Sequence, residues 1–247
     1  MTGQADLRAA DVEERLIYEL PGNGHVLFSS RAHGNMSSAG GLDHEHGYDT
    51  RERLRAQLGL RRLARGYQVH GATVLRSRTD ADIPTPDSAA VQSPVEADGQ
   101  ATSASRIGAM VLTADCLPVA LGGSSGAVAM VHAGWRGLAA GVLEEGVRAL
   151  RELGGDGDLV AVIGPGAGPC CYEVGEEVHA AFGEAQRAQS PPTRNIDLKA
   201  IARERLLAAG VTEVRDVGTC TICDERFFSY RREGARAGRQ GGVAWLS

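Results

Sequence analysis

The chain has 247 residues, of which 43% are hydrophobic and 23% charged, a composition typical of an ordinary soluble globular protein. Its formal net charge is -5, so we expect no electrostatic attraction to nucleic acid or to an anionic membrane. No apolar run approaches the roughly 20 residues of a membrane-spanning helix, and residues 1–11 lack the order of a signal peptide. We therefore expect a cytoplasmic protein with no nucleic-acid or membrane partner.

The first third of the chain carries few strong signals. Residues 1–24 are expected to form a loosely ordered N-terminal segment, before a single domain over residues 25–247. In that domain the first strand is predicted at residues 25–30, and the Gly-, Ser- and His-rich residues 31–49 form a long loop. The elements predicted next are a helix capped by Asp49 or Thr50 and ending at Leu58, a strand over residues 66–75, and a surface excursion over residues 76–100.

Regular elements are clearer after residue 100. Three short apolar segments of strand length cover residues 107–112, 117–121 and 127–132, and apolar residues at helical spacing follow over residues 138–153. The remaining predictions are a strand at 159–163, helices at 174–182 and 198–209, and strands at 211–217 and 243–246. Helices alternate with strands only in part, so we predict an α/β or α+β fold with a mixed sheet.

Three residues at the ends of predicted strands are candidate metal ligands: His70, Cys116 and His132. Two imidazoles and a thiolate with an open fourth position form a known kind of catalytic zinc site. Their spacing is too long for a local motif, however, and a buried cysteine is commonly a small core residue. A second interpretation makes Cys116 a nucleophile, paired with His132 and oriented by Asp115. Sequence order cannot separate the two interpretations, because such triads are defined by geometry.

The remaining four of the five cysteines lie in two short motifs. Cys220-Thr-Ile-Cys223 has the spacing of a redox motif or a zinc knuckle, and a complete four-cysteine site would also need Cys170 and Cys171. Adjacent cysteines rarely both reach one ion, so we expect packing thiols here. Without a secretion signal, an odd number of cysteines favours reduced thiols or metal ligands over a disulfide framework. Near these motifs, residues 227–232 are interpreted as core aromatics beside solvated arginines.

Six motifs occur in order along residues 25–247. They are Gln68–Gly71, Ala97–Gly99 with Thr102, Thr113–Pro118, His132–Gly137, Ile163–Gly175 and Cys220–Gln240. Together they resemble the bacterial laccase-domain family, whose members are also called polyphenol-oxidase-like proteins or zinc-dependent purine nucleoside phosphorylases. One departure is the loop after Ser30-Arg31, which lacks the family's usual opening.

The resemblance implies a four-layer α/β/β/α fold with mixed sheets and a zinc site at His70, Cys116 and His132. It also implies phosphorolysis of adenosine, inosine, guanosine and methylthioadenosine, together with deamination of adenosine. The alternatives are editing of peptidoglycan precursors by a Cys/His hydrolase and copper-dependent oxidation of phenols. Copper is less expected than zinc, since one His2Cys site cannot by itself carry out a four-electron reduction of oxygen.

The same activity suggests roles for further residues. Arg31 and Arg136 are candidate contacts for phosphate or ribose, because a guanidinium binds such groups through two points, and Gln68 is a third candidate substrate contact. Asp115 is expected to carry a proton or, preferably, to hydrogen-bond a ligand histidine. The expected partners are a nucleoside and phosphate, and the protein is expected to be a monomer or a homodimer.

Overall fold

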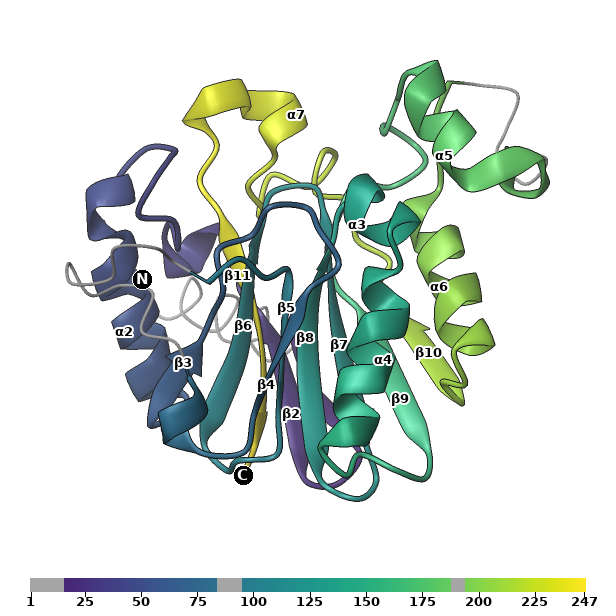
Figure 1. Cartoon of the computed structure of the whole chain (residues 1–247). Helices are drawn as coiled ribbons and strands as arrows, with labels where there is room; N and C mark the ends of the chain where they lie inside the picture. The colour runs from purple at the N-terminus through teal and green to yellow at the C-terminus, as the bar shows by residue number, and fades with distance from the viewer. Residues whose placement is uncertain (1–15, 84–94, 188–193) are drawn as a thin grey trace, which may run out of the picture.

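The computed structural model describes residues 16–83, 95–187 and 194–247. In these ranges eleven strands form two sheets, and each sheet contains both parallel and antiparallel pairs (Figure 1). The first sheet has the order β1 (Ile17–Leu20), β2 (Gly24–Phe28), β11 (Gln240–Leu246), β6 (Ile107–Thr113) and β3 (Arg62–Ala64). The second has the order β10 (Glu213–Asp216), β9 (Leu159–Ile163), β7 (Leu117–Gly123), β8 (Ala127–Ala133), β5 (Gly99–Thr102) and β4 (Val74–Ser77).

The two sheets pack face to face, and strand β2 shows how. Alternate side chains of a strand point to opposite faces, so Val26 and Phe28 lie between the sheets with Val128 and Met130 of β8. Leu27 points outward instead and belongs to a separate cluster. The inter-sheet core is therefore built from alternating residues of both sheets.

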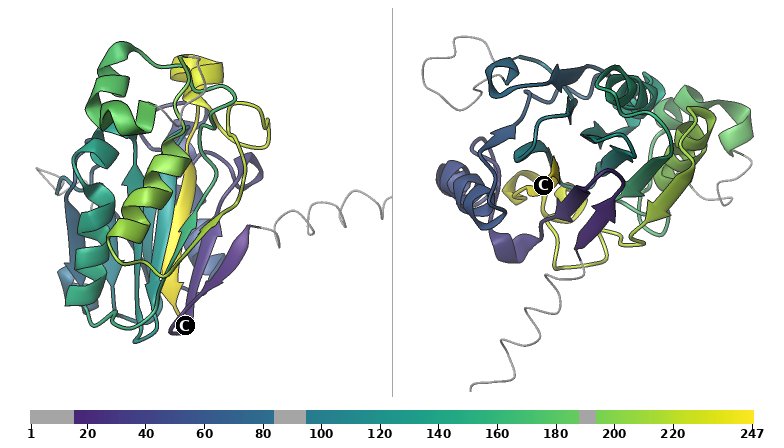
Figure 2. Two further views of the ribbon diagram at one scale, coloured as in Figure 1. Left: turned by 90° about the vertical axis from the view of Figure 1, so that its right-hand side faces the viewer. Right: turned by 90° about the horizontal axis from the view of Figure 1, so that it is seen from below.

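Helices cover the outer faces of both sheets. Helix α2 (Gly47–Gln57) packs on the first sheet through Leu54, whereas α4 (Val142–Glu152) and α6 (Leu198–Ala208) cover the second. The view from below shows helix, sheet, sheet and helix in sequence (Figure 2). The predicted four-layer α/β/β/α fold with mixed sheets is confirmed. None of the helices in the described ranges has the length and apolarity needed to span a bilayer.

Most strong sequence signals correspond to real elements. The three apolar segments after residue 100 form β6, β7 and β8, and each is almost entirely buried. The helix predicted over residues 138–153 is divided into α3 (Trp135–Ala139) and α4 by Gly141, whose φ of 89° lies in the left-handed region. The remaining helices are α5 (Glu176–Arg187) and α7 (Tyr230–Glu233).

Two predictions at the start of the chain are wrong. Residues 17–20 form strand β1, paired with β2, although a loosely ordered segment was expected through residue 24; residues 1–15 lie outside the described ranges. Residues 66–73 do not continue into a strand, and β4 begins only at Val74. Their backbone turns around the buried carboxylate of Asp98. This carboxylate accepts hydrogen bonds from backbone amides that would otherwise donate to a neighbouring strand.

Candidate metal centre

The structure brings His70, Cys116 and His132 together at one edge of the two sheets. Their ligand atoms all lie within 4.8 Å of one another. The Sγ atom of Cys116 is 3.8 Å from Nε2 of His70, and the two imidazole rings meet edge to face, 4.8 Å apart. Cys116 lies in the turn from β6 to β7, His132 near the end of β8, and His70 in the loop before β4. Three segments distant in sequence thus converge on one point.

The loop of His70 is held by the carboxylate of Asp98, which is fully buried just before β5. Three consecutive backbone amides, those of residues 69, 70 and 71, donate to this carboxylate over 2.7–3.1 Å. To turn around it, His70 adopts a φ of 61°, an uncommon conformation for a residue with a side chain. The strained backbone is compensated by these hydrogen bonds and aims the imidazole at Cys116.

Asp98 also orients the second histidine. Its Oδ1 lies 2.7 Å from Nδ1 of the buried His132, which leaves Nε2 of that ring as the nitrogen available to a metal. Burial alone would raise the pKa of Asp98. Hydrogen bonds from His132 and from the amides of Gly71 and Val69 outweigh this effect and lower the pKa below its usual value. One buried carboxylate therefore fixes two of the three candidate ligands.

Cys116 is set up as a thiolate. Burial would raise its pKa, but the charge and hydrogen bond of His132, followed by those of His70, lower it to about 6. Burial would lower the pKa of His132, whereas the Cys116 thiolate and Asp98 raise it to about 9. A thiolate is the form of cysteine that binds a metal and also the form that attacks a substrate, so the arrangement suits both chemistries proposed from the sequence.

The donor set fits a metal ion. One thiolate and two imidazoles suit zinc, and three protein ligands leave the fourth position of a tetrahedron for water or substrate. In the ranges that the structure describes, the other cluster of potential ligands consists of four cysteines. A multicopper centre with additional histidine sites is not present there.

Gly134 leaves the space in which the ligands meet. A Cβ atom at this position would lie 2.9 Å from Cδ2 of His70 and 3.0 Å from Sγ of Cys116. We expect Gly134→Ala to displace both ligands and to weaken metal binding by about 10–100-fold, the range for changes that misorient ligands. Competition with a chromophoric chelator measures the affinity. Gly40→Ala is the matched control, since a Cβ there contacts nothing within 4 Å; equal affinities of the two variants would contradict the expectation.

A pocket of about 440 Å³ opens beside the three ligands, within the size range of small-molecule sites. Aromatic side chains are scarce in this chain, at 4% of residues, yet three of its five tyrosines line the pocket. Three arginines line it as well. These tyrosines and arginines are Tyr67, Tyr172 and Tyr230, and Arg65, Arg231 and Arg239.

The three predicted substrate contacts do not come together in the way that the three ligands do. Arg31 bonds Glu233 over 2.5 Å and its guanidinium lies over the ring of Phe228, while exposed Arg136 stacks on Trp135; neither is among the residues that line the pocket. Gln68 does line it, but both ends of its amide bond the backbone of Leu112.

Asp115 lies at the pocket, but its hydrogen bonds run away from the histidines. Its carboxylate accepts from Oγ1 of Thr221 over 2.7 Å and from the amide of Arg231 over 2.8 Å. The partner of the ligand histidine is Asp98, so the preferred prediction for Asp115 is corrected. A φ of 87° turns Asp115 toward the C-terminal loop. The signal for Asp98 was present in the Ala97–Gly99 motif, although no chemistry was assigned to it.

The fold and these residues define an α/β protein with a His2Cys metal-binding group at the edge of a double sheet. The chain belongs to the family described as multi-copper polyphenol oxidoreductase laccase, whose model matches residues 23–247. The family resemblance seen in the sequence is thereby confirmed.

Curated relatives and solved structures agree with this assignment. A Xylella fastidiosa protein named purine nucleoside phosphorylase is 43% identical over 208 residues, covering 79% of this chain and 77% of the relative. A Pseudomonas aeruginosa protein of the same name is 42% identical and covers 72% of each chain. The crystal structure of Neisseria meningitidis protein NMB0706 matches with a TM-score of 0.79 at 29% identity, covering 94% of this chain and 98% of that one.

Proposed function

We propose that this protein is a zinc-dependent purine nucleoside phosphorylase that cleaves adenosine, inosine, guanosine or methylthioadenosine with phosphate. The observation that carries the proposal is the His2Cys ligand set facing a pocket lined by both tyrosines and arginines. The names of the relatives point to the same reaction class. Deamination of adenosine at the same centre is included in the proposal.

The tyrosines are suited to a purine base. Tyr67 and Tyr230 are about half exposed at the pocket, whereas Tyr172 is nearly buried in its wall. A purine offers a π face, and stacking on aromatic rings is worth about 1–3 kcal/mol per base. The hydroxyl of Thr113 is buried at the pocket without a hydrogen-bond partner among the described residues. It can therefore supply a polar contact to a base or to ribose.

The arginines are suited to phosphate. Arg231 lies with its guanidinium 4.8 Å from the ring centre of Tyr172, and the side chain of Arg239 bonds the carbonyls of Ala237 and Gly238. Planar guanidinium groups bind phosphate through paired hydrogen bonds. When phosphate attacks C1′ of the ribose and the purine leaves, charge redistributes over both, and pre-placed cations stabilise that state.

The metal would complement these residues. A zinc ion held by His70, Cys116 and His132 would supply Lewis-acid polarisation of a bound substrate or activation of water. Asp98 would keep the two imidazoles oriented and His132 in one tautomer. Asp115 would hold the backbone of Arg231 in place, so that the guanidinium stays over the pocket.

The direct test is chromatographic product analysis. Zinc-loaded protein is mixed with adenosine, with and without phosphate. Phosphate-dependent release of adenine and ribose 1-phosphate is the expected result, and inosine formed without phosphate would support the deaminase part. If adenosine, inosine, guanosine and methylthioadenosine all remain intact after incubation with phosphate and fully metal-loaded protein, the proposal is overturned.

Arg239→Gln provides a test of the phosphate contact. We expect it to raise the KM for phosphate by about tenfold, the equivalent of roughly 1.4 kcal/mol from one lost charge-assisted hydrogen bond, with a smaller change in the KM for nucleoside. Arg215→Gln is the matched control, because Arg215 lies on strand β10 and pairs with Glu213. Equal phosphate KM values for the two variants would remove Arg239 from the proposed phosphate site.

A second candidate function is a Cys/His hydrolase acting on peptidoglycan precursors. The observation that favours it is the position of the Cys116 thiol within 4.8 Å of both imidazoles, whose charges and hydrogen bonds lower the thiol pKa to about 6. His132 would then activate Cys116 as a nucleophile without metal. Two chemical treatments distinguish the hydrolase from the phosphorylase. Alkylation of Cys116 stops both, whereas removal of the metal held by His70, Cys116 and His132 stops only the phosphorylase.

A further inference from the structure

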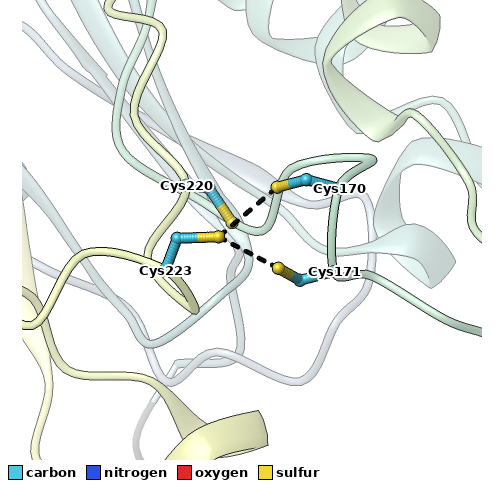
Figure 3. Close-up of side chains that lie close together, drawn as sticks. All are labelled: Cys170, Cys171, Cys220 and Cys223. Carbon is cyan, nitrogen blue, oxygen red and sulfur yellow. Dashed lines mark hydrogen bonds between the residues drawn. The ribbon is translucent and has the colours of Figure 1, made fainter.

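A second group of potential ligands lies outside the pocket. Four cysteines on two loops point their thiols toward one another (Figure 3), and all four sulfur atoms lie within 4.8 Å. The Sγ atom of Cys223 lies 3.0 Å from that of Cys171 and 3.5 Å from that of Cys170. We call this group the four-cysteine cluster; its members are Cys170, Cys171, Cys220 and Cys223.

These thiols are not the packing groups expected from the sequence. Cys170 and Cys223 are exposed, and the other two are only partly buried, so the cluster does not serve to fill the core. Four converging thiols without apolar packing need another explanation. In proteins, tetrahedral groups of four sulfurs are typical of zinc or iron–sulfur sites.

Adjacent cysteines reach the same point because the chain turns there. The amides of Cys171 and Tyr172 both bond the carbonyl of Gly168, over 3.1 and 3.0 Å. In a turn, neighbouring side chains need not point to opposite sides as they do in a strand. The turn therefore lets Cys170 and Cys171 face one point, although adjacent cysteines rarely both reach one ion.

The CxxC segment is already arranged around a sulfur acceptor. The amide of Gly168 donates to Sγ of Cys220 over 3.2 Å, and the amides of Ile222 and Cys223 also hydrogen-bond Cys220. Donation of backbone N–H groups to sulfur favours a thiolate at this position. Gly168 allows the close approach, since a Cβ there would lie 3.1 Å from Cβ of Cys220.

We propose that the four-cysteine cluster binds a structural zinc ion, separate from the pocket centre. Zinc–sulfur bonds of about 2.3 Å give a tetrahedron with edges of about 3.8 Å, and the observed separations, from 3.0 Å to at most 4.8 Å, bracket that value. Four thiolates complete the coordination and leave no open position. Binding releases the thiol protons to solvent and involves no oxidation.

The ion would fasten two loops that form a wall of the pocket. Gly166 and Cys220 are joined as an isolated parallel bridge between these loops. Thr221, next to Cys220, bonds Asp115, and Tyr172, next to Cys171, lines the pocket. Zinc at the cluster would thus hold Tyr172 and the partners of Asp115 in position, whatever reaction the pocket performs.

The test counts metal in the full-length protein. Protein purified with zinc should carry two zinc ions per chain by elemental analysis and native mass spectrometry. His70→Ala/Cys116→Ser should keep one, and its cobalt derivative should show the intense ligand-field and charge-transfer bands of a tetrathiolate. Cys220→Ser/Cys223→Ser should also keep one, without those bands. Cys170→Ser/Cys171→Ser repeats the measurement from the other loop.

Three results would overturn the proposal. One is a wild-type protein with a single zinc that the pocket variant loses. Another is a pocket variant whose one metal ion survives replacement of Cys220 and Cys223. The third is a mass showing a disulfide within the cluster of protein purified under reducing conditions with zinc. If the cysteine variants do not fold, the metal count and cobalt spectrum of the pocket variant still decide the matter.

Discussion

Replacing His132 by alanine is expected to lower phosphate-dependent nucleoside cleavage by about a thousandfold or more. The imidazole is buried between Cys116 and Asp98, so its removal takes away one of three ligands and leaves Asp98 with an unpaired charge. Loss of a metal ion's charge stabilisation costs several kcal/mol of activation free energy, and each 1.36 kcal/mol is a factor of ten. Steady-state kcat/KM, measured beside zinc content, reports the effect.

His25→Ala is the matched control for this variant. His25 lies on β2 and pairs with Trp245 near the end of β11. The opposite end of the sheet holds Thr113, which lines the pocket. The His25→Ala variant should retain full zinc content and activity. A His132→Ala protein that is folded, lacks pocket zinc and still cleaves nucleoside with phosphate would contradict the metal-dependent function.

The central strands could be predicted because their signal is local. Strands β6, β7 and β8 are short apolar runs bounded by turn residues, and burial on both faces requires that composition. The face-to-face packing of two sheets was not visible in any single segment. It came from the family resemblance. His70, Cys116 and His132 were candidate ligands from their residue types at predicted strand ends, but their separations in sequence are too large for spacing to indicate a site, and the resemblance strengthened that grouping.

The contacts that escaped prediction are long-range ones. The turn of residues 66–73 depends on Asp98, which is 27–29 residues away, and nothing in the local pattern distinguishes that turn from a strand. The positions of Arg231 and Arg239 depend on a loop that crosses over the sheet edge from the C-terminal part of the chain. The charge pattern of residues 227–232 suggested solvated arginines, whereas Arg231 lines the pocket, as does Arg239.

The four-cysteine cluster shows how an assumption about backbone shape can mislead. Side chains alternate along an extended chain, and there adjacent cysteines are poor co-ligands. The turn at Gly168 removes that alternation, and the CxxC motif, which begins 52 residues further on, folds back to meet it. The sequence shows both cysteine motifs, but it does not show that they lie close together in the fold.

Asp98→Asn is expected to destabilise the protein by about 3 kcal/mol, because a fully buried carboxylate that accepts from three amides and an imidazole is replaced by a group with one acceptor oxygen. For a chain of this size, that corresponds to a fall in Tm of roughly 6–12 °C. We also expect metal affinity to fall by about 10–100-fold, since His132 loses the partner that fixes its tautomer. Thermal unfolding and chelator competition measure the two effects separately.

Asp82→Asn is the comparison that separates these effects from the general loss of a carboxylate. Asp82 also accepts hydrogen bonds from two consecutive backbone amides, those of Arg78 and Thr79, but at the surface. The Asp82→Asn variant should keep the metal affinity of the wild type.

The pH dependence of stability adds a third readout. The pKa of Asp98 is lowered in the folded protein, so the stabilisation by its carboxylate is present above the unfolded-state pKa and disappears as pH falls through the folded-state pKa. Wild type should therefore lose its advantage over Asp98→Asn in acid; a constant difference across that range would mean that the Asp98 charge does not hold the ligand loop.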